Sequence, residues 1–209
     1  MNIAVIGTGD MGGALALAFS RRHHVTVTAS RPGSDSARQV IGASAGRIRE
    51  AARGEAVASA DVIVLAVPWA AVDDALEGGV PDGKILLVVS VPWVGDGKPL
   101  AIGTTSSGAE HVAAKVPGAR VVQAFNTVAS ATVKDPAAHG AAATVIVSGD
   151  HAEAKEVVSG LARELGFDVV DAGPLTSARY TEPMALLWAA LAYDGGYGED
   201  VAFRVLRGR

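Results

Sequence analysis

A glycine-rich turn directly follows the first apolar run of the chain. Residues 1–6, Met-Asn-Ile-Ala-Val-Ile, have the composition of a buried parallel strand. Gly7, Gly9 and Gly12 follow in the pattern G-x-G-x-x-G, and residues 13–19 are mostly good helix formers. Strand, glycine turn and helix in this order are the context in which the motif is typical of dinucleotide binding.

Each glycine of the turn has an expected task. Gly7 permits a tight exit from the strand, Gly9 leaves room for a pyrophosphate, and Gly12 lets the helix pack closely on the sheet. A helix beginning near Asp10 would direct its free N–H groups and positive dipole end at the phosphates. The alternative, a glycine-rich turn that binds nothing, is disfavoured by the flanking strand and helix.

Composition narrows the class of protein. The chain has 209 residues, 49% hydrophobic and 19% charged, enough for one domain with at most a small appendage. A formal charge of −4 argues against a general nucleic-acid or anionic-membrane binder, and the absence of cysteine excludes disulfides and cysteine metal sites. The N-terminus enters the first strand directly and the longest apolar run, residues 184–193, is too short to span a bilayer, so a cytoplasmic protein is expected.

The end of the second expected strand, residues 24–29, bears on the choice of cofactor. An NAD site usually has Asp or Glu here, whereas this chain continues with Ser30 and Arg31 and has no carboxylate before Asp35. A hydroxyl and a forked guanidinium suit a 2′-phosphate, and Arg38 could face the same group. The alternative for Arg31 is a solvated loop arginine. The pattern predicts a preference for NADPH over NADH.

The rest of the chain alternates between strand and helix patterns. Strands are expected at residues 61–67, 84–89, 119–125, 143–148 and 167–171, with a weak candidate at 47–49. Helices are expected at residues 50–59, 69–77, 107–115 and 150–165, within part of 34–50, and from residue 177 in two pieces broken at 194–196. Ser107 and Glu110 form a capping box at the start of one of these helices, and Asp150 is expected to cap another.

These elements predict an α/β fold: a Rossmann-type, doubly wound, mostly parallel sheet of about eight strands with a small C-terminal helical cap. Residues 1–175 would form the NADP-binding Rossmann domain. Residues 176–209 would pack on its acceptor side and form a dimer interface. Val67 and Pro68, just past a strand end, should border the cofactor, and residues 91–105 should form a long loop on the same side.

Several stretches together resemble one family, the NADP-dependent oxidoreductases of the coenzyme F420 type. They are I-G-T-G-D-M-G-G at 6–13, A-S-R at 29–31, A-V-P-W at 66–69, Q-A-F-N-T-V at 123–128 and D-A-G-P-L-T-S-A-R-Y-T-E-P at 171–183. They occur in the family's order over nearly the whole chain. The resemblance implies hydride transfer between NADP(H) and a planar acceptor, with the deazaflavin coenzyme F420 as co-substrate.

The resemblance also implies a set of site residues. The 2′-phosphate would be held by Thr8, Ser30 and Arg31, with Arg38 as a further candidate. The pyrophosphate would meet the backbone of residues 9–11, including Asp10 and Met11. The nicotinamide would be surrounded by Ala66, Val67, Pro68, Ala124 and Asn126, and the acceptor ring would be bordered by residues 91–93 and the C-terminal helices.

Two features depart from the family's pattern and leave the acceptor open. Asn126 stands where the deazaflavin reductases tend to carry histidine, and the loop at 91–105 also differs. The alternatives are an NADPH-dependent reductase of a flavin, quinone or other small metabolite, and a non-catalytic NADP(H)-binding redox sensor.

No catalytic acid–base residue and no metal site are expected. Hydride transfer depends mainly on holding the reacting atoms close together, and the chain has no Tyr-x-x-x-Lys motif and no histidine pair at i, i+4. Arg179, Tyr180 and Glu182 could touch the acceptor or pack at a helix start. Residues 184–193 would be apolar all round a helix, which must then be buried under loops or against a second subunit, and a homodimer is predicted.

Overall fold

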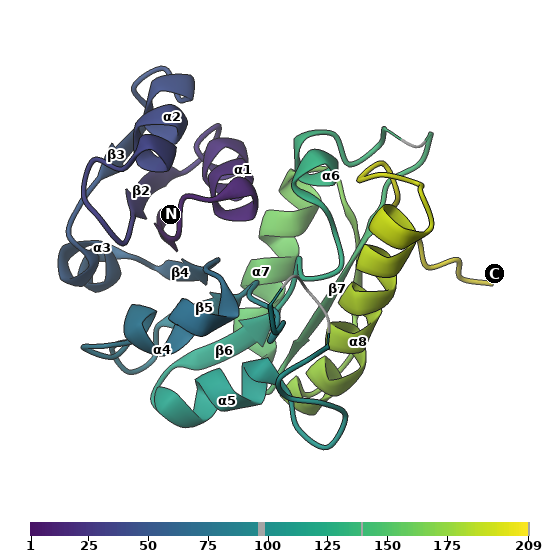
Figure 1. The fold of residues 1–209 in the computed structure, drawn as a ribbon. Helices are drawn as coiled ribbons and strands as arrows, with labels where there is room; N and C mark the ends of the chain where they lie inside the picture. Colours follow the sequence, from purple (N-terminus) through teal and green to yellow (C-terminus); the bar gives the residue numbers. More distant parts are fainter. Residues whose placement is uncertain (96–98, 139, 209) are drawn as a thin grey trace.

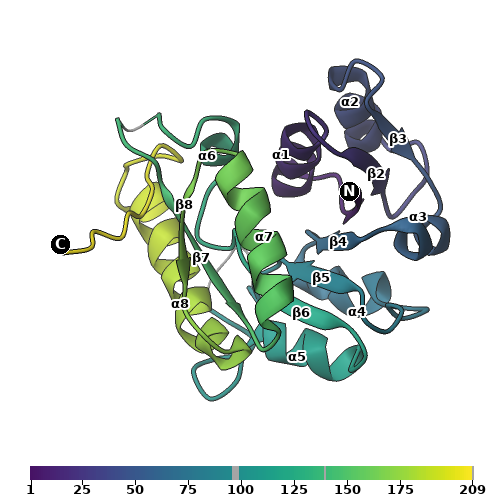
Figure 2. The same cartoon turned by 180° about the vertical axis from the view of Figure 1, so that it is seen from behind.

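A single eight-stranded sheet carries the fold. The structure, a computed structural model, describes residues 1–95, 99–138 and 140–208, so part of the loop at 91–105 lies outside the described residues. The strand order is β3-β2-β1-β4-β5-β6-β7-β8. Figure 1 shows β3 and β7 towards opposite ends of this sheet, and Figure 2 shows β8 beside β7. The strands are β1 (Asn2–Ile6), β2 (His24–Thr28), β3 (Ile48–Glu50), β4 (Val62–Leu65), β5 (Ile85–Val88), β6 (Arg120–Gln123), β7 (Thr144–Gly149) and β8 (Asp168–Asp171).

Neighbouring strands run parallel except for β6 and β7, which pair antiparallel. The predicted α/β fold, a mostly parallel doubly wound sheet, is therefore confirmed. The strand order reverses direction at β1, because β2 and β3 lie on one side of it and β4 on the other. In open α/β sheets ligands bind beyond the carboxyl ends of the strands at such a switch point.

Helices cover both faces of the sheet, because alternate residues of the buried strands enter two separate cores. Ile3 and Val5 of β1 belong to one core, and Ala4 and Ile6 belong to the other. The helices are α1 (Asp10–Phe19), α2 (Asp35–Ala43), α3 (Arg53–Ser59), α4 (Val72–Ala75), α5 (Gly108–Lys115), α6 (Ser130–Lys134), α7 (Ala152–Glu164) and α8 (Ala178–Ala189). Helix α7 lies in front of the sheet in Figure 2, and α8 lies on the opposite face beside β7 and β8.

Two helix predictions are wrong in detail. Asp150 does not cap α7: the N-cap is His151, without a side-chain bond, and Asp150 Oδ1 instead accepts a hydrogen bond from Leu175 N at 2.9 Å. The second C-terminal helical piece is absent, since residues 195–208 contain no helix. Gly196 and Gly198 have φ of +71° and +68°, and this left-handed backbone turns the chain out of the helix.

The tail after α8 instead folds back along that helix and reaches the sheet. Trp188 Nε1 donates to Val201 O at 2.7 Å, and Thr144 N donates to Phe203 O at 2.9 Å. In the single chain Leu187 of helix α8 is 52% exposed. The expected burial of this helix against a second subunit stays a prediction. The described part of the chain has no helix that combines the length and apolarity needed to cross a membrane.

Candidate cofactor-binding site

The glycine turn joins β1 to α1 with its backbone in close contact with β4. Gly7 has φ of +105°, and a Cβ there would lie 2.2 Å from Ala66 O. A Cβ on Gly12 would lie 2.1 Å from Gly7 O, so both positions exclude a side chain. Gly9, by contrast, faces open space, because among the described residues no heavy atom beyond its chain neighbours lies within 4 Å of its Cβ position. It is also the N-cap of α1 without a side-chain capping bond, so the first N–H groups of the helix are available to an anion.

A cluster of hydroxyl groups lies where α2 begins, next to this turn. Thr8 is buried, and its Oγ1 lies 2.7 Å from Ser36 Oγ. Ser36 Oγ lies 3.2 Å from Ser34 Oγ, and Ser34 caps α2 by accepting from Ala37 N. Sequence reasoning singled out Thr8 and missed Ser34 and Ser36, although a serine just before a helix is a recognised capping signal.

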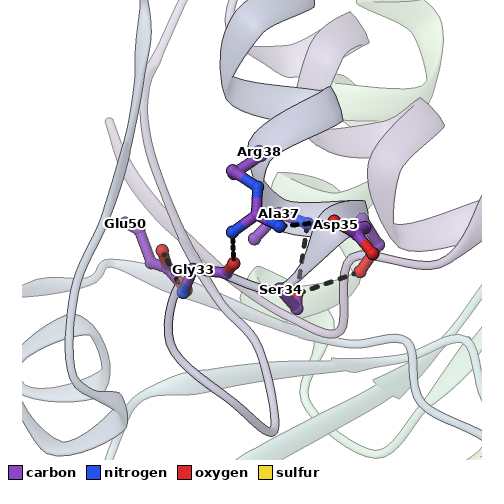
Figure 3. Close-up of polar contacts among 7 residues, drawn as sticks. Gly33, Ser34, Asp35, Ala37, Arg38 and Glu50 are labelled. Carbon is purple, nitrogen blue, oxygen red and sulfur yellow. Dashed lines mark hydrogen bonds and ion pairs between the residues drawn. The ribbon is translucent and has the colours of Figure 1, made fainter.

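The loop between β2 and α2 holds Ser30 and Arg31, both of which are exposed. The guanidinium of Arg31 has no partner among the described residues, so it is free to meet a ligand. Glu50 at the end of β3 fixes this loop. Its two carboxylate oxygens accept hydrogen bonds from Gly33 N at 3.1 and 3.2 Å (Figure 3). Sequence reasoning missed this role of Glu50, which depends on the pairing of β2 with β3.

Arg38, unlike Arg31, is bound to neighbouring groups of the protein. Its guanidinium donates to Gly33 O and forms an ion pair with Asp35, and both side chains are largely exposed (Figure 3). The structure therefore brings Arg38 to the loop but engages it in bracing the first turn of α2.

The other end of the site follows β4, β5 and β6. Ala66, Val67 and Pro68 leave β4 beside the glycine turn, and Ser90 leaves β5. Ser90 Oγ accepts from Val67 N at 3.1 Å and donates to Val67 O at 2.6 Å. This buried hydroxyl fixes the backbone after β4, a role that the sequence did not reveal.

Residues 124–126 continue β6 through a strained turn. Ala124 N still donates to Val88 O at 3.3 Å, but Phe125 has φ of +63°, which is rare for a residue with a bulky side chain. The Phe125 ring is fully buried and packs edge-to-face on Phe19 and Phe167, with centroid distances of 6.3 and 5.8 Å. This packing stabilises the strained backbone and places Asn126 at the edge of the sheet formed by the carboxyl ends of the strands.

A buried carboxylate lies behind this turn. Glu182 of α8 is 1% exposed and accepts hydrogen bonds from Gly108 N at 2.9 Å, Ala109 N at 3.1 Å and Gln123 Nε2 at 2.8 Å. Burial raises the pKa of Glu182, and the three donors offset part of that rise. The side chain thereby joins the start of α5 to the end of β6.

Arg179 makes a second link between α8 and α5. Its Nε and Nη2 donate to the two carboxylate oxygens of Glu110 at 2.9 and 2.6 Å, and the guanidinium lowers the pKa of that carboxyl. Ser107 caps α5 by accepting from Glu110 N, as the sequence predicted. Arg179 and Glu182 thus make structural contacts, whereas Tyr180 is 74% exposed.

The expected acceptor side is formed by the chain after β5. Trp93 and Leu100 form an isolated antiparallel bridge, and Ala101 N donates to Pro92 O at 2.6 Å. A Cβ on Gly108 would lie 3.0 Å from both Pro92 and Trp69, so this loop packs tightly on the start of α5.

The fold and the glycine turn together define a Rossmann-type dinucleotide-binding protein. Residues 2–92 match the sequence profile of the family described as NADP oxidoreductase, coenzyme F420-dependent. The F420-dependent NADP reductase of Methanothermobacter thermautotrophicus is 30% identical over 204 residues, covering 90% of this chain and 87% of that protein. The chain therefore belongs to the coenzyme F420-dependent NADP oxidoreductase family. It is an NADP-dependent oxidoreductase that binds NADP(H), as the resemblance implied.

Two further relatives extend the comparison. A crystal structure of a proposed F420-dependent NADP reductase from Arthrobacter sp. FB24 superposes with a TM-score of 0.85 at 30% identity, covering 99% of this chain and 100% of that one. The metalloreductase STEAP3 of Rattus norvegicus is 30% identical over 190 residues. That match covers 88% of this chain but only 36% of the rat protein, so this chain spans about a third of its length.

Proposed function

We propose that this chain transfers a hydride between NADP(H) and the deazaflavin coenzyme F420. The observation that carries the proposal is the glycine turn, where a Cβ on Gly9 would meet open space at the start of α1. The parallel strands β1, β4, β5 and β6 all end at the same edge of the sheet as this turn. A dinucleotide laid across the carboxyl edge of the sheet would fit this arrangement. The deazaflavin acceptor is supported by the relative from Methanothermobacter thermautotrophicus and by the structure from Arthrobacter.

We assign the cofactor-binding residues by the part of the dinucleotide that each would meet. The 2′-phosphate would lie against Thr8, Ser30 and Arg31, with Arg38 bracing the loop. The pyrophosphate would meet the turn, and the nicotinamide would lie among the residues that follow β4 and β6. The turn residues are Gly7, Gly9, Asp10, Met11 and Gly12, and the nicotinamide residues are Ala66, Val67, Pro68, Ala124 and Asn126.

The chain's own contribution to the reaction would be positioning. When bound, the dinucleotide supplies or accepts the hydride at its nicotinamide ring. The backbone fixed by Ser90 and the strained turn at Phe125 would hold one face of that ring. The loop after β5 and residues 176–209 would form the acceptor side and keep the reacting carbons about 3–3.5 Å apart.

A spectroscopic assay tests the acceptor. Purified protein is mixed with NADPH and oxidised F420, and a parallel sample contains FMN. Rapid bleaching of F420 alone would support the proposal. Bleaching of FMN alone would favour the second candidate, a reductase of another planar acceptor. This candidate is supported by Asn126, which stands where the deazaflavin reductases tend to carry histidine. Tight NADPH binding without bleaching of either acceptor would favour a redox sensor.

We also propose that α8 contributes to a homodimer. Tyr180 and Leu187 are 74% and 52% exposed, and Met184 lies between them, so the three residues follow i, i+4, i+7 spacing along α8. This apolar stripe suits a second copy of the helix. Sedimentation velocity at micromolar concentration should show a dimer that Leu187→Glu dissociates. A wild-type monomer under these conditions would contradict the proposal.

A further inference from the structure

The orientation of the Asn126 side-chain amide is determined by its neighbour. Asn126 Nδ2 donates to the main-chain oxygen of Thr181 at 3.0 Å. A carbonyl oxygen can only accept a hydrogen bond, so the NH₂ end of the amide must face Thr181 and Oδ1 must face elsewhere. Asn126 is 8% exposed, and Oδ1 is buried without a hydrogen-bond partner in the described part of the chain. A buried acceptor without a donor is costly, which points to a donor that is supplied on binding.

A chain of hydrogen bonds holds this orientation. Thr181 Oγ1 donates to Gln123 Oε1 at 2.6 Å, and Gln123 Nε2 donates to Glu182 Oε1 at 2.8 Å. Glu182 is in turn fixed by the two N–H groups at the start of α5. Rotation of the Asn126 amide by 180° would set Oδ1 against the Thr181 carbonyl and break the chain at its end.

The position of Asn126 indicates what the missing donor is. The residue follows β6 at the carboxyl edge of the sheet, and strand β6 pairs with β5, which in turn pairs with β4. The strained backbone at Phe125 sets the direction in which Asn126 leaves the sheet. The nicotinamide was assigned to this edge above, and its carboxamide carries an NH₂ donor on the ring.

We infer that Asn126 Oδ1 accepts a hydrogen bond from the carboxamide NH₂ of the nicotinamide, with Gln123, Thr181 and Glu182 as positioning residues. This inference rests on the proposed placement of the cofactor. The bond would fix the rotation of the ring about its glycosidic bond and so select the ring face that meets the acceptor. Asn126 would then be a specificity-determining residue.

Binding of three ligands distinguishes the contribution of this hydrogen bond from that of the rest of the site. The first is NADPH and the second is its reduced 3-acetylpyridine analogue, in which a methyl group replaces the NH₂. The third, 2′-phospho-ADP-ribose, lacks the nicotinamide ring. Wild type should bind NADPH about three- to tenfold more tightly than the analogue, the size expected for one hydrogen bond. Asn126→Ala should lose this preference and bind 2′-phospho-ADP-ribose as wild type does.

A matched control is available in the next residue. Thr127 is 1% exposed, against 8% for Asn126, so it is more deeply buried than the residue under test. Thr127→Val removes a hydroxyl of the same turn at nearly constant volume. It should leave the preference for NADPH over the analogue unchanged. Gln123→Met, which removes both hydrogen bonds of Gln123, should lower the preference without changing the affinity for 2′-phospho-ADP-ribose, as expected for a positioning role.

The inference is overturned if Asn126→Ala keeps the preference, or if it weakens 2′-phospho-ADP-ribose to the same degree as NADPH. An unchanged preference in Gln123→Met would remove the positioning role. The assay measures binding alone, so it gives an answer even if F420 is not the acceptor. A wild type that binds 2′-phospho-ADP-ribose no better than ADP-ribose would instead refute the proposed 2′-phosphate site.

Discussion

Replacement of Glu182 by alanine removes an acceptor that three buried donors share. Gly108 N, Ala109 N and Gln123 Nε2 would all lose their partner, in a place where the carboxylate is 1% exposed. A buried donor left without a partner costs about 1–3 kcal/mol. Three such donors set an upper range of about 3–9 kcal/mol, which is reduced by water entering the vacated space and by relief of the carboxylate's burial.

We therefore expect Glu182→Ala to lower the free energy of unfolding by about 3–5 kcal/mol, a large part of the total for a domain of this size. Glu182→Gln keeps one acceptor oxygen and should cost about 1–2 kcal/mol. Burial raises the pKa of Glu182 above its ordinary value of 4.5, so the native state holds this proton more tightly than the unfolded state. The stability of wild type relative to Glu182→Gln should thus fall as the pH rises from 4.5 through the raised pKa.

Urea unfolding followed by circular dichroism measures these differences. Glu156 on α7 provides the control, because its side chain is 72% exposed and Glu156→Ala should stay within about 0.5 kcal/mol of wild type. If Glu182→Ala were as stable as this control with an unchanged m-value, the carboxylate would not hold α5 to β6, and the reasoning would fail.

Three further perturbations test other parts of the molecule. Arg31→Ala should weaken NADPH binding at least about tenfold in titration calorimetry, while the affinity for NADH changes little. Arg38→Ala should have a smaller effect, because Arg38 only stabilises the loop. Equal losses of affinity for NADPH and NADH in Arg31→Ala would refute phosphate recognition. Gly9→Val should abolish binding of both cofactors yet keep the melting temperature close to wild type, because the Cβ enters open space; retained affinity would overturn the assignment of the turn. The lowered pKa of Glu110 means that its pairing with Arg179 stabilises the fold above pH 4.5 and is lost as the pH falls through the folded pKa. Arg179→Met should therefore remove that loss from a series of thermal melts in acid, and an unchanged acid limb would contradict the pairing.

Local patterns were sufficient to predict most of the fold. The glycine turn, the long apolar runs and the capping serine at residue 107 each act within a few residues, so their sequence signals are strong. Strand β3 was harder because it has only three residues, Ile48–Glu50, of which only Ile48 is buried. Helix α6, with five residues, gave no periodic signal and was missed.

The contacts that organise the site could not be read from the sequence. Glu182 meets Gln123 and Gly108 across separations of 59 and 74 residues, and only the order of strands brings them together. The same holds for Glu50, whose role depends on a loop 17 residues earlier in the chain. The left-handed backbone of Phe125 is also invisible in the sequence, because bulky residues rarely adopt it.

The turn after β6 separates two tasks between adjacent residues. Phe125 fixes the course of the backbone through a ring anchored on Phe19 and Phe167, whereas Asn126 presents its side chain at the edge of the sheet. A change at position 126 therefore need not disturb the core, while a change at position 125 would. Because the two tasks are separate, substitutions at position 126 can change the group presented to the ligand with little effect on folding. Position 126 would therefore be a site at which this fold could evolve toward a different acceptor.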